Sequence, residues 1–242
     1  MNPTGLSALA CLVVAFLIGS IPTALLLGRL RGVDIREHGS GNVGATNAMR
    51  VLGRGWGLAC LLADILKGCL PALLPMAEFL GLAGPIDAWM WAFGLAAIAG
   101  HMFSPWLRFR GGKGVATSLG VMLAIAPIPM LVAFFVGALM IWLTGYVSLA
   151  SMTGAALMPV LILAEALVRH PGVVPWTSIG VTLFLGALVI WKHRGNIQRL
   201  RDGTEQRLFG GAATSDEDET PTPNTPAAEA VEIEVEADDN DN

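Results

Sequence analysis

The chain has 242 residues, of which 54% are hydrophobic and only 14% are charged. This composition is too apolar for a soluble domain of this length, which excludes an ordinary water-soluble fold and makes a membrane the natural solvent. A helix needs about 20 apolar residues, at about 1.5 Å each, to cross a hydrocarbon core about 30 Å thick. Several stretches of the chain approach that length.

Charge divides the chain into two parts. The formal net charge is -4, but residues 211–242 hold 11 of the 19 acidic residues and no Lys or Arg, which leaves a net charge of +7 on residues 1–210. The cationic part suits anionic partners, either lipid headgroups or phosphorylated substrates. We therefore predict a membrane domain over 1–210 and an acidic, disordered cytoplasmic tail over 211–242.

The cysteines and the N-terminus indicate neither a metal site nor a cleaved leader. Cys11, Cys60 and Cys69 all lie in apolar stretches, with no CxxC pair and no His at ligand spacing, so we expect buried packing and no metal. The first apolar run lacks a basic n-region and an A-x-A cleavage site, so we interpret it as a retained first span.

Hydropathy predicts an all-α integral membrane protein with seven transmembrane helices. The third and fourth are short for full spans, which leaves open five spans with a re-entrant or interfacial piece. The predicted helices cover 6–29, 55–76, 88–103, 115–127, 129–144, 151–168 and 175–191.

The basic residues orient this arrangement. With seven spans, 13 of the 15 Lys and Arg residues fall on one side, in the segments 29–54, 108–113 and 192–207. Only Arg169 lies on the opposite side, and Lys67 lies within the second span. The positive-inside rule then predicts an N-terminus outside and a C-terminus in the cytoplasm.

The first cytoplasmic loop, DIREHGSGNVGATNAMR over 34–50, has a composition typical of phosphate binding. Glycines let backbone amides approach an anion closely, and short hydroxyl and amide side chains add hydrogen-bond donors. A Gly/Asn-rich turn without a ligand explains the same letters. Arg50 favours phosphate, because a guanidinium can bind it bidentately. The candidate residues are Ser40, Asn42, Gly44, Thr46, Asn47 and Arg50.

A second polar loop covers 100–118, where Gly111, Gly112 and Lys113 precede an apolar helix. A helix N-terminus with a Gly-rich lead and a cation is suited to an anion. It is not a Walker A loop, because Leu107 occupies the position of the first glycine and Gly114 follows the lysine, so nucleotide hydrolysis is disfavoured. For His101, in the same segment, we expect a structural hydrogen bond.

The segment WKHRGNIQRLRDGTE over 191–205 follows the last predicted span. A basic membrane anchor explains its arginines. It does not require His193 and Asn196, which lie three residues apart and share one face if the helix continues, so both could contact one ligand.

Two further features lie within or near the spans. Asp64 and Lys67 lie three residues apart in the second span, and because hydrocarbon disfavours charge we expect them to pair and face the protein interior. Tyr146 and Ser148 lie on a short cytoplasmic connection, and for them site lining and a plain turn are equally plausible.

In order along residues 1–210, the polar segments resemble the bacterial PlsY acyl-phosphate:glycerol-3-phosphate acyltransferases. The tail lies outside the resemblance. The matching segments are GSIPTALLLGR (19–29), GSGNVGATN (39–47), GHMFSPWLRFRGGKGVAT (100–117), YVSLAS (146–151) and HRGNIQRLRDGTE (193–205).

The resemblance implies a multi-pass enzyme of the bacterial inner membrane with its site at the cytoplasmic face. Such an enzyme transfers an acyl group from acyl phosphate to the 1-hydroxyl of glycerol 3-phosphate, giving lysophosphatidic acid and phosphate, the first committed step of phospholipid synthesis. It implies no metal or other cofactor, no nucleic-acid partner, contact with membrane lipid, and an upstream enzyme that forms acyl phosphate.

The resemblance also assigns site residues. Ser40, Asn42, Thr46 and Arg50 would bind phosphate or order its loop, Lys113 with the Gly111 and Gly112 amides would hold an anionic substrate, and His193 and Asn196 would contact glycerol 3-phosphate. The catalytic candidates are Ser40, Lys113, His193 and Asn196. The candidates for binding substrate or phosphate are Asn42, Gly44, Thr46, Asn47, Arg50, Gly111, Gly112 and Ser148.

The residues constrain the chemistry independently. Many other glycerol-3-phosphate acyltransferases use a His with an Asp five positions later as a general base, and none of the four histidines here has one. Acyl phosphate is an activated donor, so positioning and charge neutralisation can lower much of the barrier. We hypothesise that a substrate phosphate accepts the hydroxyl proton while His193 orients the acceptor.

Two other functions fit part of the pattern. An organophosphate transporter would also need Gly-rich motifs and basic loops, but it needs a site reachable from both faces, and the polar motifs here cluster on one. A lipid-binding structural protein would need anionic attraction only, not three separate polar segments.

Overall fold

The computed structural model describes residues 3–77, 80, 82 and 84–208, and the predicted acidic tail lies outside these residues. The described residues contain helices and no β-strand, which confirms the all-α prediction. The α-helices are α1 (Pro3–Ser20), α2 (Thr23–Leu30), α3 (Ala45–Leu52), α4 (Arg54–Leu73), α5 (Ile86–Met102), α6 (Val115–Ile125), α7 (Pro127–Thr144), α8 (Val147–Arg169), α9 (Trp176–Lys192) and α10 (Arg194–Arg201), with 3₁₀ turns η1 (Leu74–Met76) and η3 (Pro105–Leu107).

Four helical segments are long and apolar enough to cross a membrane: Arg54–Met76, Ile86–Leu107, Pro127–Thr144 and Val147–Arg169. The pair α1 and α2 meets the same criterion if it is taken as one bent span, which makes five. All seven predicted stretches are helical, but α6 and α9 are shorter than a full span. At about 1.5 Å per residue, the 11 residues of α6 extend only about 16 Å.

The first predicted span, 6–29, is not one continuous helix, and that prediction was wrong in this respect. The chain breaks between Ser20 and Thr23, and the two helices meet at 44°. Pro22 lacks an N–H and its ring clashes with the preceding turn, which ends the regular hydrogen bonding. Side chains from other elements satisfy the freed carbonyls: Ser104 Oγ donates to Ser20 O at 2.7 Å, and Lys67 Nζ donates to Ile21 O at 2.8 Å.

Two helix crossings are closer than ordinary side chains allow. A β-carbon on Gly100 of α5 would lie 2.1 Å from the carbonyl oxygen of Phe16 in α1, and one on Gly120 of α6 would lie 2.0 Å from that of Ile65 in α4. Small residues at such crossings let helix backbones pack directly, which is the usual basis of association inside a membrane. The pairs α1/α5 and α4/α6 therefore form a tightly packed centre.

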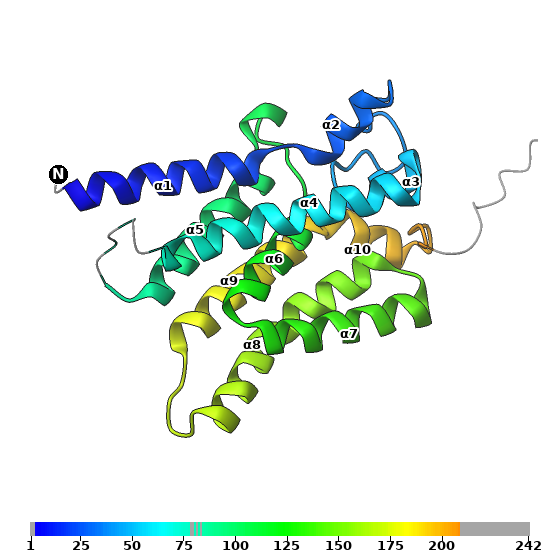
Figure 1. Ribbon diagram of the computed structural model, residues 1–242. Helices are drawn as coiled ribbons and strands as arrows, with labels where there is room; N and C mark the ends of the chain where they lie inside the picture. Colours follow the sequence, from blue (N-terminus) through cyan, green and yellow to red (C-terminus); the bar gives the residue numbers. More distant parts are fainter. Residues whose placement is uncertain (1–2, 78–79, 81, 83, 209–242) are drawn as a thin grey trace, which may run out of the picture. The chain divides into compact units, whose positions relative to one another are not determined.

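The helices run back and forth between two ends of the bundle (Figure 1). The helices α2, α3 and α10 lie at one end, together with the turn between α7 and α8. The start of α1, the end of α4, the start of α5 and the connection α8–α9 lie at the other. The three polar segments that the sequence singled out come together, because residues of all three line one cavity.

Candidate active site

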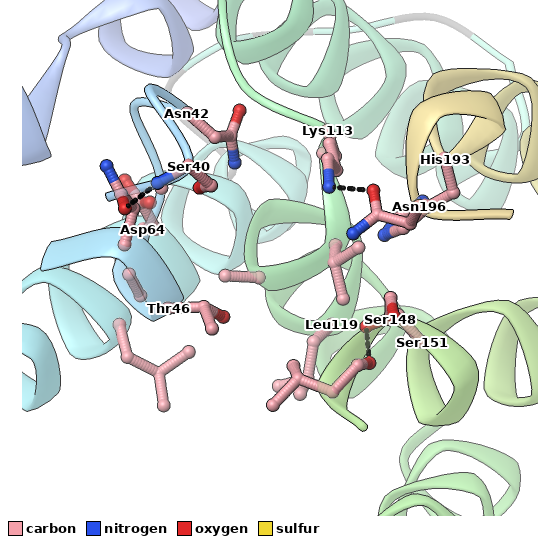
Figure 2. A pocket seen from close by; sticks show the side chains of 18 of the residues that line it. Ser40, Asn42, Thr46, Asp64, Lys113, Leu119, Ser148, Ser151, His193 and Asn196 are labelled. Carbon is pink, nitrogen blue, oxygen red and sulfur yellow. Dashed lines mark hydrogen bonds between the residues drawn. The ribbon is translucent and has the colours of Figure 1, made fainter. Parts of the chain in front are cut away.

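A polar cavity of about 160 Å³ lies where these segments meet. Figure 2 shows Ser40, Asn42 and Thr46 on one side of it and Lys113, Asn196 and His193 on the other. Its polar lining residues are Ser40, Asn42, Thr46, Asn47, Arg50, Asp64, His101, Lys113, Ser148, Ser151, His193, Asn196 and Glu205.

The loop before α3 is held in shape by one buried side chain, that of Asn47. Its Nδ2 donates to the carbonyls of Ile35 and His38 at 3.1 Å each, and its Oδ1 accepts from the Ser40 N–H at 2.8 Å. Gly39 has φ +62°, and a β-carbon there would lie 2.4 Å from Asn47 Oδ1. Asn47 therefore orders the loop, since its amide is already engaged with backbone groups.

Ser40, Asn42 and Thr46 line the cavity beside the N-terminus of α3, together with Gly44. Arg50 follows on the same helix, and its Nη2 donates to the carbonyl of Gln206 at 3.0 Å. The buried Arg50 Nε has no hydrogen-bond partner within the described residues. Burial lowers the pKa of Arg50, yet a guanidinium stays charged in proteins, so a buried cationic donor remains free to bind an anion.

Lys113 enters the cavity from the Gly-rich loop before α6. Its Nζ donates to Asn196 Oδ1 of α10. Burial lowers the pKa of Lys113 to about 8, although the nearby Glu205 carboxylate acts to raise it. At neutral pH the ammonium group therefore remains mostly charged, but it is easier to deprotonate than an exposed lysine.

Glu205 is the centre of the hydrogen-bond network on this side. Its Oε1 accepts from Ser148 Oγ and from Asn196 Nδ2 at 2.6 Å each, and its Oε2 accepts from Arg199 Nε at 2.8 Å. Burial acts to raise the pKa of the Glu205 carboxyl, but these three hydrogen bonds outweigh it and hold the pKa below its usual value. Glu205 thus stays ionised and fixes the positions of Ser148 and Asn196.

His193 lies at the junction of α9 and α10 and is buried. Its Nδ1 lies 2.8 Å from the carbonyl oxygen of Val189. Since a carbonyl only accepts, Nδ1 carries the proton, which leaves Nε2 as an acceptor in the neutral ring. Burial, with the Lys113 charge as the next cause, lowers the pKa of His193 to about 4, so the ring is neutral at physiological pH.

The structure differs from the sequence interpretation at Gly111 and Gly112, which do not line the cavity. The Gly112 N–H donates to the His101 carbonyl at 3.1 Å, and a β-carbon on Gly112 would lie 2.2 Å from His101 Nε2. These glycines allow His101 to pack closely behind the loop, so the structure does not support anion binding by the Gly112 amide. His101 itself lines the cavity.

The buried pair Asp64–Lys67 is present as predicted, with 2.7 Å between Lys67 Nζ and Asp64 Oδ1. Thr23 Oγ1 also donates to Asp64 Oδ1 at 2.9 Å, so the pair connects α4 to the α1/α2 break and to the start of α2. Asp64 additionally lines the polar cavity, which the sequence did not predict.

The two candidates near the α7–α8 turn have different positions. Ser148 lines the cavity, whereas Tyr146 does not and instead lies beneath Arg207, whose guanidinium carbon is 5.4 Å from the tyrosine ring centre. Over the described part of the chain, no group of three or more His, Cys, Asp or Glu could hold a metal ion.

A second, apolar pocket of about 330 Å³ adjoins the polar cavity. Met49, Ile65, Met122, Phe134 and Ile141 are among its lining residues. It shares seven lining residues with the polar cavity: Ala45, Thr46, Leu61, Val115, Leu119, Val147 and Ser151. A charged site is thus continuous with a pocket suited to a hydrocarbon chain.

Comparison with known proteins identifies the family. The family profile described as glycerol-3-phosphate acyltransferase matches residues 9–203. A glycerol-3-phosphate acyltransferase of Geobacter sulfurreducens is 50% identical over 204 residues, which cover 84% of this chain and 98% of the relative. The chain belongs to the glycerol-3-phosphate acyltransferase family. Glycerol-3-phosphate acyltransferase 1 of Deinococcus radiodurans is 47% identical over 203 residues, covering 84% and 96%.

Solved structures of a family member agree. The crystal structure of PlsY (YgiH), an integral membrane glycerol 3-phosphate acyltransferase, in its glycerol 3-phosphate form has a TM-score of 0.73 and 39% identity, covering 84% of this chain and 96% of that one. The lysophosphatidic acid form gives a TM-score of 0.71 at the same identity and coverage. The resemblance of this chain to the PlsY family is confirmed. Like the solved PlsY, this chain is an integral membrane protein.

Proposed function

We propose that this chain transfers an acyl group from acyl phosphate to the 1-hydroxyl of glycerol 3-phosphate and releases phosphate and lysophosphatidic acid. One observation carries the proposal: the polar cavity, which contains Arg50 and Lys113, and the apolar pocket are joined by seven shared residues. Such a site can hold a phosphate and a hydrocarbon chain of one donor at the same time. The glycerol 3-phosphate and lysophosphatidic acid forms of the PlsY structures support the acceptor and the product.

In this proposal, Arg50 and Lys113 neutralise the two phosphate groups that the reaction brings together. Arg50 has a buried Nε free for an acceptor, and Lys113 extends into the same cavity. Ser40, Asn42 and Thr46 add hydrogen bonds beside the N-terminus of α3. Buried cations are effective here because negative charge develops on the leaving phosphate, and fixed charges need no reorganisation to stabilise it.

The acceptor contacts His193 and Asn196 in this proposal. The neutral His193 ring offers Nε2 to a glycerol hydroxyl, while Glu205 holds Asn196 and Ser148 in place. The hydroxyl oxygen attacks the acyl carbonyl, a new ester C–O bond forms, and the bond between the acyl carbon and the phosphate oxygen breaks. The hydroxyl proton passes to a substrate phosphate oxygen, since a histidine with a pKa of about 4 is a weak base.

We further propose seven crossings, with the N-terminus outside and the site at the cytoplasmic face of the bacterial inner membrane. The cavity is lined by residues that lie before α4, before α6, at the start of α8 and at the end of α9. The chain therefore leaves the cavity end of the bundle and returns to it three times, through the pairs α4/α5, α6/α7 and α8/α9. With α1 added, the number of passages is odd. Orientation follows from the concentration of Lys and Arg at this end. An enzyme that forms acyl phosphate is the expected upstream partner.

The test incubates purified protein with acyl phosphate and glycerol 3-phosphate and measures lysophosphatidic acid and released phosphate. The two products should form in equal amounts. We expect turnover with acyl phosphate and little with acyl-CoA. Lys113→Ala should lose activity, while Arg201→Ala, which removes an exposed cation from the same end, should not. Turnover with acyl-CoA but none with acyl phosphate would contradict the proposed donor.

A further inference from the structure

One face of α7 and one face of α8 line the apolar pocket, together with residues of α3, α4 and α6. Its lining residues recur at helical spacing in both helices, from Met130 to Ile141 in α7 and from Val147 to Met158 in α8. These helices lie side by side and run in opposite directions (Figure 1). From Val147, which also lines the polar cavity, to Met158 is 11 residues, or about 16 Å along the helix.

Three buried methionines, Met122, Met130 and Met158, line the end of the pocket farthest along α6, α7 and α8 from the polar cavity, and we call them the methionine floor. They come from three different helices, α6, α7 and α8, and belong to one buried cluster. Methionine is unbranched and adaptable, so it can fill the end of a pocket against chains of slightly different length.

Midway along the wall, Gly154 contributes no side chain. A β-carbon built on it would have no atom within 4 Å, so close packing does not require glycine there. Gly120 differs, because a β-carbon on it would collide with α4. Glycine inside a helix is less favourable than alanine, and the space left beside Gly154 is part of the apolar pocket. The glycine therefore keeps the pocket open.

We propose that Gly154 and the methionine floor set the length of the acyl chain that the enzyme accepts. The inference rests on the proposed acyl-transfer function and assigns a specificity role within its donor site. The acyl carbonyl lies at the shared residues, and the chain passes Gly154 and ends at Met158. A side chain at position 154 blocks the path midway, whereas a smaller residue at position 158 lengthens it.

The experiment compares kcat/KM for octanoyl phosphate and palmitoyl phosphate in the wild type and in Gly154→Ala, Gly154→Leu and Met158→Ala. Gly154→Leu should lower kcat/KM for palmitoyl phosphate by at least about 50-fold. Each methylene of the acyl chain that loses its apolar contact lowers kcat/KM about fourfold, and the leucine side chain displaces about three methylenes. The octanoyl value of Gly154→Leu should stay close to that of the wild type, which also reports that the variant folds. Gly154→Ala should give a smaller shift in the same direction. Met158→Ala, assayed in addition with eicosanoyl phosphate, should raise kcat/KM for that longer donor relative to palmitoyl phosphate.

Gly180→Leu is the matched control. Gly180 is also a helical glycine with no atom within 4 Å of its β-carbon position, but it is exposed on α9 and does not line the pocket. Gly180→Leu should leave kcat/KM for both donors unchanged. An unchanged chain-length profile in Gly154→Leu, with normal turnover, would overturn this inference alone. If that variant is inactive with both donors, an unshifted Gly154→Ala profile overturns it. No turnover by the wild type with any acyl phosphate would overturn the proposed function as well.

Discussion

The Lys113 ammonium donates a hydrogen bond to Asn196 Oδ1, joining two polar segments that lie 83 residues apart. The contact orients the Asn196 amide so that its Nδ2 donates to Glu205, while the charge of Lys113 still faces the cavity. One lysine therefore orders a neighbouring amide and supplies positive charge for a bound anion.

Lys113 should give the activity an alkaline limit. Burial lowers the pKa of Lys113 to about 8, so its charge is present below that pH and is lost above it. Because kcat/KM reports ionisations of the free enzyme and substrate, it should fall as pH rises through about 8. Lys113→Arg should move this limit above the accessible range, since an arginine stays protonated to a pH of about 12 or higher. Lys113→Ala should lower kcat/KM by about 10²- to 10³-fold.

The pH profile of Lys113→Arg decides this prediction, provided the variant keeps measurable activity. An alkaline limb that remains near pH 8 in Lys113→Arg would mean that another group titrates there. Arg201→Ala serves as the control for a general loss of positive charge, and it should show the wild-type profile.

Glu205 should be needed both for stability and for the geometry of the acceptor site. Glu205→Ala leaves the donors of Ser148, Asn196 and Arg199 without their acceptor, and we expect a loss of about 2 kcal/mol in the free energy of unfolding. Since the fold depresses the pKa of Glu205, its contribution is present above the ordinary carboxyl pKa and is lost as pH falls through the depressed value. Thermal unfolding in one detergent, followed from neutral to acid pH, measures the loss of stability and its dependence on pH.

Glu205→Gln separates charge from shape. The glutamine oxygen can replace one acceptor, so stability should recover in part, while the interaction with Arg199 should not. Equal unfolding midpoints for Glu205→Ala and the wild type at neutral pH would argue against this network. Asp202→Ala, an exposed change in the same turn, provides the control.

Much of this site was predictable, because the apolar stretches and the positions of Lys and Arg between them can be read directly from the sequence. Both follow from the cost of burying charge in hydrocarbon, so the seven helical stretches and the common end of the polar segments were foreseen. Glu205 was missed for a physical reason. It approaches Asn196 only because the chain reverses after α10, where Gly203 has φ +71° and the Glu205 N–H donates to Arg199 O.

The roles within the Gly-rich loops were harder to predict, because the same letters serve different tasks. Asn42 and Asn47 carry identical amides and both line the cavity, yet the Asn47 amide is already hydrogen-bonded to backbone groups of the loop and orders it. Gly111 and Gly112 have the composition of a phosphate loop, but they make room for His101. Only the three-dimensional packing distinguishes an amide that faces a ligand from one that is already hydrogen-bonded.

The buried pair Asp64–Lys67 should behave as one unit. Lys67→Met leaves the Asp64 charge without its partner and removes the donor to Ile21 O, so we expect a loss of about 3 to 5 kcal/mol. Replacing Asp64 by Asn in the same protein removes the stranded charge, so the double variant should be more stable than Lys67→Met alone. A double-mutant cycle on unfolding midpoints in detergent measures the coupling. Additive losses would mean that the two charges do not interact.

His193 should orient the acceptor without accepting its proton. Its pKa of about 4 leaves the ring neutral across the working range, so it cannot produce a limb in the pH profile near pH 6. A phosphate monoester has its second ionisation at a pKa of about 6, and a proton-accepting substrate phosphate should produce an acid limb there. His193→Gln keeps a side chain that can hydrogen-bond, so we expect a lower kcat with the acid limb retained. If the limb disappears in a folded His193→Gln protein, proton transfer depends on the histidine and the substrate-phosphate mechanism is wrong.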